Sequence, residues 1–184
     1  RMVAEYTRKY YNPAAAGWKY LSADDMQRVR ELSAWKAFVK ENWDDLEIVS
    51  VDARIDDGKE ISDLNIQQPQ LEVGSELSVL AAIKLGKLNP QDVSVQVYHG
   101  NVNSEGKIES GMPAPMEYKS YEEQTHLSIF EGAIPCRSAG RHGFAVRILP
   151  NHPDLVEQYE PGLILWEGTI DKTAQTPVAA GSEA

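Results

Sequence analysis

The sequence predicts a mainly β protein, an antiparallel immunoglobulin-like β-sandwich of seven to eight strands preceded by two α-helices. Apolar residues recur every three or four positions up to Trp43 and every second position beyond it. Eight short apolar runs follow, separated by Gly, Pro, Asn or Asp, without a helical pattern between them. At this length, antiparallel strands without intervening helices usually form two packed sheets.

The first predicted helix opens the chain. Its apolar residues fall near one face at helical spacing: Met2, Val3, Tyr6, Tyr10 and Tyr11. We expect it to end at Asn12–Pro13, because the residue before proline disfavours the helical conformation, and a connector to follow over 14–20. The opening has neither an initiator Met nor a capping residue, so we expect this helix to belong to something longer.

The second helix is predicted over 23–42. Ser22, with Asp25 three residues later, forms a variant of the capping box that marks a helix start. One flank is apolar and needs a packing partner: Met26, Val29, Leu32, Trp35, Val39 and Trp43. We expect an interface, on the sandwich or on another copy of the chain, that uses these aromatic residues: Tyr6, Tyr10, Tyr11, Trp35 and Trp43.

Strands follow the helices. The clearest alternation lies in ELSVLAAIKLG, from Glu76, and in DVSVQVYHG, from Asp92. Further strands are predicted at 46–55, 61–67, 115–121, 125–134, 142–149 and 163–167. The chain then divides into a helical segment over 1–43, a β-sandwich over 44–168 and a mobile tail over 169–184.

Composition excludes several classes of protein. The 184 residues are 42% hydrophobic and 25% charged, enough for one sizeable core. Cys136 is the only cysteine, which excludes an intramolecular disulfide and a cysteine-based zinc site. No run of about 18 apolar residues and no signal peptide marks the chain for membrane or export, so we expect a cytoplasmic protein.

Charge is distributed unevenly. The formal net charge is -10, but residues 1–43 carry eight Lys/Arg against five Asp/Glu, so the acidic excess lies entirely beyond them. An acidic body repels phosphate backbones and anionic lipids. We therefore expect neither nucleic-acid nor membrane-surface binding.

Candidate catalytic residues are sparse. His99, His126, His142 and His152 lie on four separate segments without metal-ligand spacing. The glycines around Arg141 indicate a tight turn rather than a phosphate-binding loop, because no Gly-Lys-Ser/Thr run accompanies them. Glu122 and Glu123 are adjacent and so point to different sides. We predict no catalytic, cofactor-binding or metal-binding residue.

The aromatic residues leave a glycan site open. Candidate residues for stacking on sugar rings are Tyr98, Tyr118, Tyr121 and Tyr159. Such a site requires two or three of them exposed on one face, with polar neighbours. Trp166 follows an apolar run and is expected to be buried.

Five stretches together carry a resemblance: RMVAEYTRKYYNPA, ELSAWKAFVKENW, VGSELSVLAAIKLGKLNPQDVSVQVYHGNVN, GAIPCRSAGRHGFAVRILPNHPDL and PGLILWEG. Over residues 1–168 the chain resembles the C-terminal region of bacterial and archaeal α-glucan (glycogen or maltodextrin) phosphorylases of the long subgroup. The resemblance implies that the first helices close a glycosyltransferase domain and that the β region is an accessory domain.

The family reaction, as the resemblance implies, is phosphorolysis of α-1,4-glucan to glucose 1-phosphate, with pyridoxal phosphate on a lysine. That lysine would lie before Arg1, so the cofactor is expected only in the parent enzyme and no catalytic residue is carried over. Two roles remain open for this chain. It is a structural or interaction module, partnered by the upstream catalytic domain or by itself, or it is a glycan-binding module that holds α-glucan. The structural role predicts an affinity for maltoheptaose weaker than about millimolar.

Overall fold

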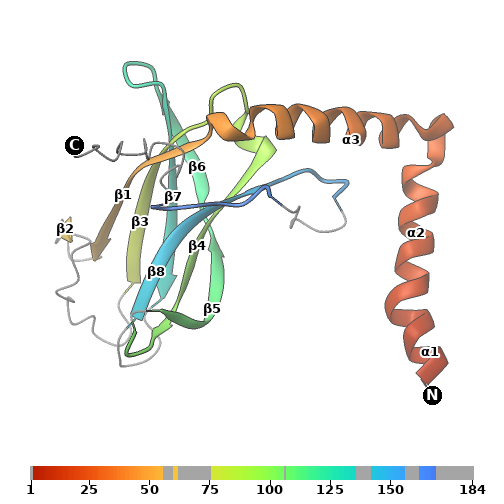
Figure 1. The fold of residues 1–184 in the computed structure, drawn as a ribbon, viewed down its shortest axis with the longest axis horizontal. Helices are drawn as coiled ribbons and strands as arrows, with labels where there is room; N and C mark the ends of the chain where they lie inside the picture. The colour runs from red at the N-terminus through yellow and green to blue at the C-terminus, as the bar shows by residue number, and fades with distance from the viewer. Residues whose placement is uncertain are drawn as a thin grey trace, which may run out of the picture.

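The computed structural model describes residues 2–55, 60–61, 76–105, 107–135, 142–155 and 162–168. Figure 1 shows a helical arm, a second long helix that leaves it at a sharp corner, and a sandwich of two sheets at the far end of that helix. The predicted fold class, two helical parts followed by an antiparallel β-sandwich, is confirmed.

The helical arm is one continuous run. It consists of α1 (Met2–Tyr6), the π-helical segment η1 (Thr7–Tyr11) and α2 (Asn12–Leu21). The predicted stop at Asn12–Pro13, with a connector over 14–20, is therefore wrong. The Asn12 N–H bonds to the Thr7 carbonyl, five residues back, and this π-helical turn accommodates the ring of Pro13 at the start of α2.

The next helix is α3 (Ala23–Asn42), predicted over 23–42, and a left-handed turn interrupts it near its start. Asp24, Asp25 and Met26 have φ values of 52°, 55° and 60°, so the chain changes direction there. The predicted capping box is wrong. Ser22 has a helical backbone and its side chain makes no capping bond, while Asp25 pairs with Arg30 at 3.2 Å. Within the described ranges, no helix combines the length and the apolar character needed to cross a bilayer.

Two antiparallel sheets form the sandwich. The first has the order β2-β1-β3-β7-β6 and the second β5-β4-β8-β9. The strands are β1 (Glu47–Ile55), β2 (Glu60–Ile61), β3 (Glu76–Lys84), β4 (Val93–Val102), β5 (Ile108–Pro115), β6 (Glu117–Glu122), β7 (Leu127–Pro135), β8 (His142–Pro150) and β9 (Leu165–Trp166). The 3-10 turns are η2 (Trp43–Asp45) and η3 (Pro90–Asp92). In immunoglobulin notation the order is A-B-E-D facing C′-C-F-G, apart from the short β2.

One strand escaped the sequence analysis. β5 contains Gly111, Pro113 and Pro115, which normally interrupt strands, but it lies at a sheet edge, where proline is tolerated. Of the strand predicted over 61–67, the structure describes only its start in β2. Residues 62–75, the turn around Cys136 and the tail predicted over 169–184 lie outside the described residues.

The core lies between the sheets and extends beneath α3. Alternate side chains of β3 and β4 are buried, as the period of two predicts. Val39 is 0% exposed and Trp43 6% exposed, and both belong to the cluster that the sheets build. The C-terminal end of α3 is therefore part of the sandwich core.

Trp35 adds a polar link between α3 and the sandwich. Its Nε1 donates a hydrogen bond of 2.8 Å to the Asp92 carboxylate, and its ring lies 4.7 Å from that of His152. Asp92 also accepts bonds from the Asn89 backbone N–H and side-chain amide, at 2.8 and 3.0 Å. Because both ends of this network are anchored, α3 projects from the sandwich in a defined direction.

Replacing Trp43 with alanine should destabilise the chain by about 3 kcal/mol or more, because it opens a cavity in the core. Trp18→Ala is the matched control, since Trp18 is 64% exposed, and it should change stability by about 0.5 kcal/mol or less. Urea unfolding followed by circular dichroism measures both. Equal effects of the two substitutions would contradict this packing.

Candidate functional site

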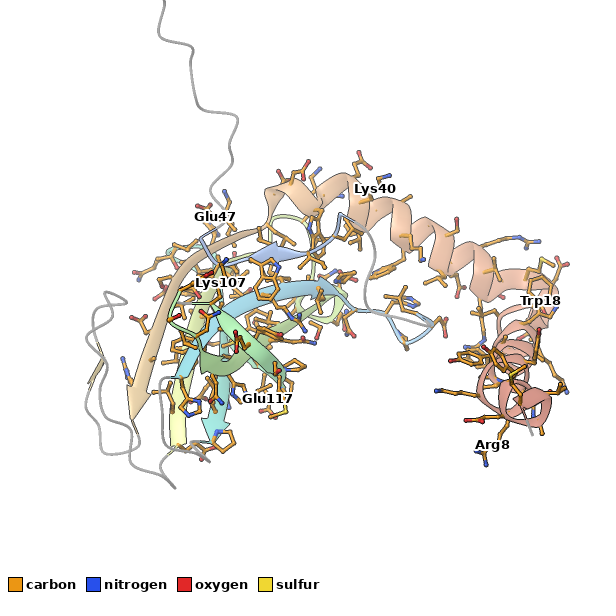
Figure 2. The ribbon with its side chains drawn as sticks, turned by 60° about the horizontal axis from the view of Figure 1, so that its bottom comes forward. Arg8, Trp18, Lys40, Glu47, Lys107 and Glu117 are labelled. Carbon is orange, nitrogen blue, oxygen red and sulfur yellow. The ribbon has the colours of Figure 1, made fainter. Side chains whose placement is uncertain are left out.

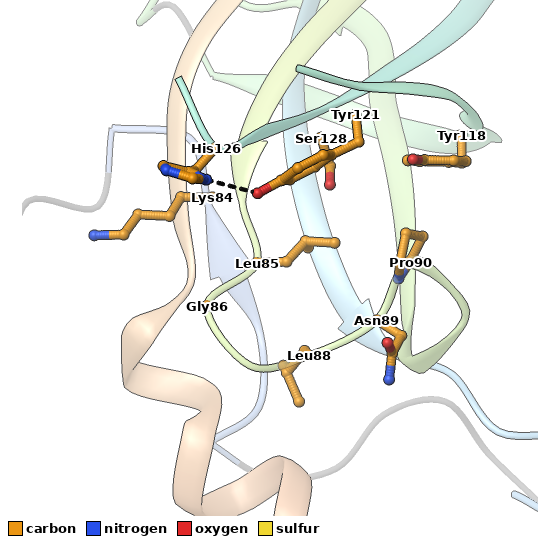
Figure 3. Close-up of a pocket in the computed structure, with 10 residues that line it drawn as sticks. All are labelled: Lys84, Leu85, Gly86, Leu88, Asn89, Pro90, Tyr118, Tyr121, His126 and Ser128. Carbon is orange, nitrogen blue, oxygen red and sulfur yellow. Dashed lines mark hydrogen bonds between the residues drawn. The ribbon is translucent and has the colours of Figure 1, made fainter. Parts of the chain in front are cut away.

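The two tyrosines of β6 share a pocket at the open side of the sandwich (Figure 3). It has a volume of about 500 Å³. Tyr118 and Tyr121 line it from β6, His126 and Ser128 from the adjoining turn and β7, and the loop between β3 and β4 closes it. Two of the four predicted glycan-stacking residues therefore lie together.

A register shift brings the two tyrosines to one face. Residues three apart on a regular strand point to opposite sides, but β6 is irregular between Tyr118 and Ser120. Tyr118 consequently pairs with Phe130, and Tyr121 with Ser128. Both partners on β7 are buried, so the two tyrosines lie over the inner face of the sheet.

The outer face of β6 is fixed by an ion pair. The Lys119 ammonium lies 3.1 Å from the Glu131 carboxylate on β7, and the Ser78 hydroxyl donates to the same carboxylate at 3.2 Å. These two contacts, the lysine first, lower the pKa of Glu131 from its ordinary value. They hold the edge strand against its neighbour while its tyrosines stay on the opposite face.

Each tyrosine ring is also braced. Tyr118 makes an edge-to-face contact with Phe130, with ring centroids 5.6 Å apart. A hydrogen bond of 2.9 Å joins the Tyr121 hydroxyl to Nδ1 of His126. The two tyrosines nevertheless remain 44% and 50% exposed, so both rings are held by protein contacts and still face solvent.

The floor of the pocket is largely apolar. Leu85 and Leu88 are 6% and 5% exposed and come from the loop between β3 and β4. Gly86 shapes this loop: its φ is +60°, and an added Cβ would lie 2.9 Å from the side chain of Asp45. A side chain at that position would be strained, and it would push the loop away from η2.

Ser128 is the deepest polar group in the pocket, at 3% exposure. Its hydroxyl has no hydrogen-bond partner among the described residues. Every fully buried side-chain polar atom in the described part of the chain does have a partner, so the Ser128 hydroxyl is not fully buried. The hydroxyl therefore opens into the pocket, as Figure 3 shows.

Tyr98 lies elsewhere, on the outer face of the second sheet. The Arg147 guanidinium stacks between the rings of Tyr98 and Trp166, at 5.0 and 5.3 Å from their centroids, and donates to the Gln96 carboxamide oxygen at 3.1 and 2.8 Å. Tyr98 and Trp166 also touch edge to face. These rings are half-buried and occupied by the arginine. Tyr159 lies outside the described residues.

The structure separates the candidate interface residues. Trp43 is buried and Trp35 half-buried against the sandwich, whereas Tyr6, Tyr10 and Tyr11 are 54%, 54% and 69% exposed on the arm. Tyr6 and Tyr10 contact each other, with ring centroids 5.4 Å apart. The arm thus carries an aromatic surface that no described residue covers.

The predicted histidines stay apart. His99 lies in β4, His126 in the turn before β7, His142 at the start of β8 and His152 after it. Among the described residues, no three His, Cys, Asp or Glu side chains gather as metal ligands. Glu122 accepts a bond from Thr125 within its exposed turn, and Glu123 follows it there.

Comparison with known proteins identifies the β region. Residues 43–168 match the family model "Glycogen phosphorylase C-terminal domain". The glycogen phosphorylases of Mycobacterium bovis and Mycobacterium tuberculosis H37Rv are each 30% identical over 164 residues, 89% of this chain and 18% of theirs. The maltodextrin phosphorylase of Thermococcus litoralis is 30% identical over 174 residues, 93% of this chain and 18% of its own.

The chain therefore spans about a fifth of the length of these relatives. No solved structure gave a significant match. The family model covers well over half of the chain and all of its described strands. The chain belongs to the glycogen phosphorylase C-terminal domain family.

Proposed function

We propose that this chain is the non-catalytic C-terminal accessory region of an α-glucan phosphorylase, with a structural role. In this proposal the sandwich carries the helical arm, and the arm docks onto the catalytic part of the same polypeptide. That catalytic part binds pyridoxal phosphate and converts α-1,4-glucan and phosphate to glucose 1-phosphate in the cytoplasm. The names of the relatives, a glycogen and a maltodextrin phosphorylase, support the substrate class.

The uncovered aromatic surface of the arm carries the proposal. Figures 1 and 2 show the arm standing away from the sandwich, with Trp18 and Arg8 on it. Seven of its large apolar side chains are more than half exposed: Met2, Val3, Tyr6, Tyr10, Tyr11, Trp18 and Tyr20. In proteins most of the stability of a helix comes from packing of its apolar face, and exposed apolar surfaces of this kind usually meet a partner.

The relatives indicate which partner. The matched region is 89% of this chain, more than residues 43–184 contain, so it must include part of the arm or α3. In the relatives this region belongs to a chain more than five times longer. We therefore place the remainder of the same polypeptide against the arm. Self-association is the competing outcome.

Arg28 helps to hold the arm in place. Its guanidinium lies over the Tyr20 ring, 4.2 Å from the centroid, and donates to the Tyr20 hydroxyl. The same group lies 3.9 Å from the Asp154 carboxylate, which follows β8. One side chain thus contacts both the end of the arm and the sandwich. These contacts favour an arm held in a fixed direction over an arm that moves freely.

The described lysines do not fit pyridoxal phosphate. A lysine that forms an aldimine is desolvated in a pocket. All the described lysines are exposed except Lys36, which is half-buried on α3. No step of the reaction is therefore assigned to this chain.

The isolated chain should neither release glucose 1-phosphate from maltodextrin and phosphate nor form an internal aldimine. A coupled assay for glucose 1-phosphate and an absorbance spectrum with added pyridoxal phosphate measure these two properties. An aldimine band that one lysine substitution removes would contradict the non-catalytic role.

Replacing Tyr6 and Tyr10 together with alanine should weaken docking. The partner is the phosphorylase polypeptide without its C-terminal region, and calorimetry should show a Kd raised tenfold or more, about 1.4 kcal/mol. Alanine favours helix, so the loss would not come from unfolding of the arm.

Tyr121→Ala is the matched control for docking, since this tyrosine is 50% exposed but lies on the sandwich. It should leave the Kd unchanged. Equal effects of the two variants, or an arm that only joins two copies of this chain in sedimentation experiments, would refute docking onto the catalytic part.

A further inference from the structure

We propose that the pocket between Tyr118 and Tyr121 binds a short stretch of neutral α-1,4-linked glucan. The site holds the polymer beside the enzyme and has no part in its chemistry. The identity of the sugar rests on the proposed function, whereas the existence of the site rests on the pocket itself.

Size and shape favour a small ligand. The volume of about 500 Å³ falls within the range of ordinary ligand sites. The tyrosine rings and the leucine floor provide apolar surface on two sides, and the Ser128 hydroxyl lies between them. A pyranose ring has matching surfaces, with C–H groups on its faces and hydroxyls around its rim.

The polar groups of the pocket favour a neutral ligand. None of the described residues that line it carries a carboxylate. In Figure 3 the Tyr118 hydroxyl points toward the side formed by Tyr121 and Ser128, while the Lys84 chain extends away from that space. Hydroxyl groups that face a shared space act both as donors and as acceptors, as the hydroxyls of a sugar require.

The site is also preorganised. The contact with Phe130 holds the Tyr118 ring, and the bond to His126 holds the Tyr121 ring, so little side-chain freedom is lost on binding. His126 itself has a φ of +58°, a left-handed conformation, in the turn that carries it. The Ser128 hydroxyl lines the pocket from a buried residue, and it gains a partner when a ligand binds.

Weak binding is enough for this role. A shallow site with two half-exposed rings should have a Kd of about 0.1 to 1 mM. Linkage to a catalytic domain raises the effective concentration of the polymer, so the enzyme benefits without high affinity. This range is tighter than a purely structural module predicts, because the register shift of β6 brings two rings to one face.

The test is a titration of the 184-residue chain with maltoheptaose, followed by amide chemical shifts in NMR and by calorimetry. We expect shifts confined to β6, the turn before β7 and the loop between β3 and β4. Tyr118→Ala and Tyr121→Ala should each weaken binding fivefold or more. Ser128→Ala removes one hydroxyl with little risk to folding, and should weaken it about threefold.

Tyr6→Ala is the matched control, because Tyr6 is 54% exposed but lies on the arm. It should leave glucan affinity unchanged. Cellohexaose, a β-linked glucan, and glucose 1-phosphate should bind at least fivefold more weakly than maltoheptaose. Shifts absent at 10 mM maltoheptaose, shifts located away from the pocket, or equal affinity for the β-linked sugar would each overturn the proposal. None of these results bears on docking, which depends on Tyr6 and Tyr10.

Discussion

The burial of the end of α3 in the sandwich core is the interaction on which the arrangement depends. Val39 and Trp43 make the helix a component of the core, and the bond from Trp35 to Asp92 fixes its exit. Without this junction, α3 and the arm would have no fixed direction relative to the sandwich. With it, the sandwich acts as a rigid base, and the corner at Asp24–Met26 sets where the aromatic surface of the arm faces.

A second local irregularity shapes the other surface of the molecule. The register shift in β6 costs a regular strand pairing but turns Tyr118 and Tyr121 to the same side. The ion pair between Lys119 and Glu131 keeps that edge in place from the opposite face. The direction of the arm depends on the packing of α3, and the pocket depends on the register shift in β6. The two lie on different parts of the chain, so each can be altered without the other.

Periodicity sufficed to predict the sandwich, because alternation is strong in β3 and β4 and tight turns punctuate the chain. It could not predict β5, whose prolines lie at an edge, or the helix through Pro13, where a π turn accommodates the ring. The site was predicted only as four tyrosines. Tyr118 and Tyr121 meet because of the register shift in β6, whereas Tyr98 lies on the other sheet with Arg147 stacked on it, and both are tertiary effects.

Hydrogen exchange over residues 2–21 tests the central claim most directly, that the arm is a docking element. Backbone amides in a solvent-exposed helix open locally with little free energy, whereas docked ones are protected. The account predicts fast exchange in the isolated chain, and protection increased about a hundredfold in the longer phosphorylase polypeptide that we propose contains it. Equal exchange of the arm in both proteins would contradict it.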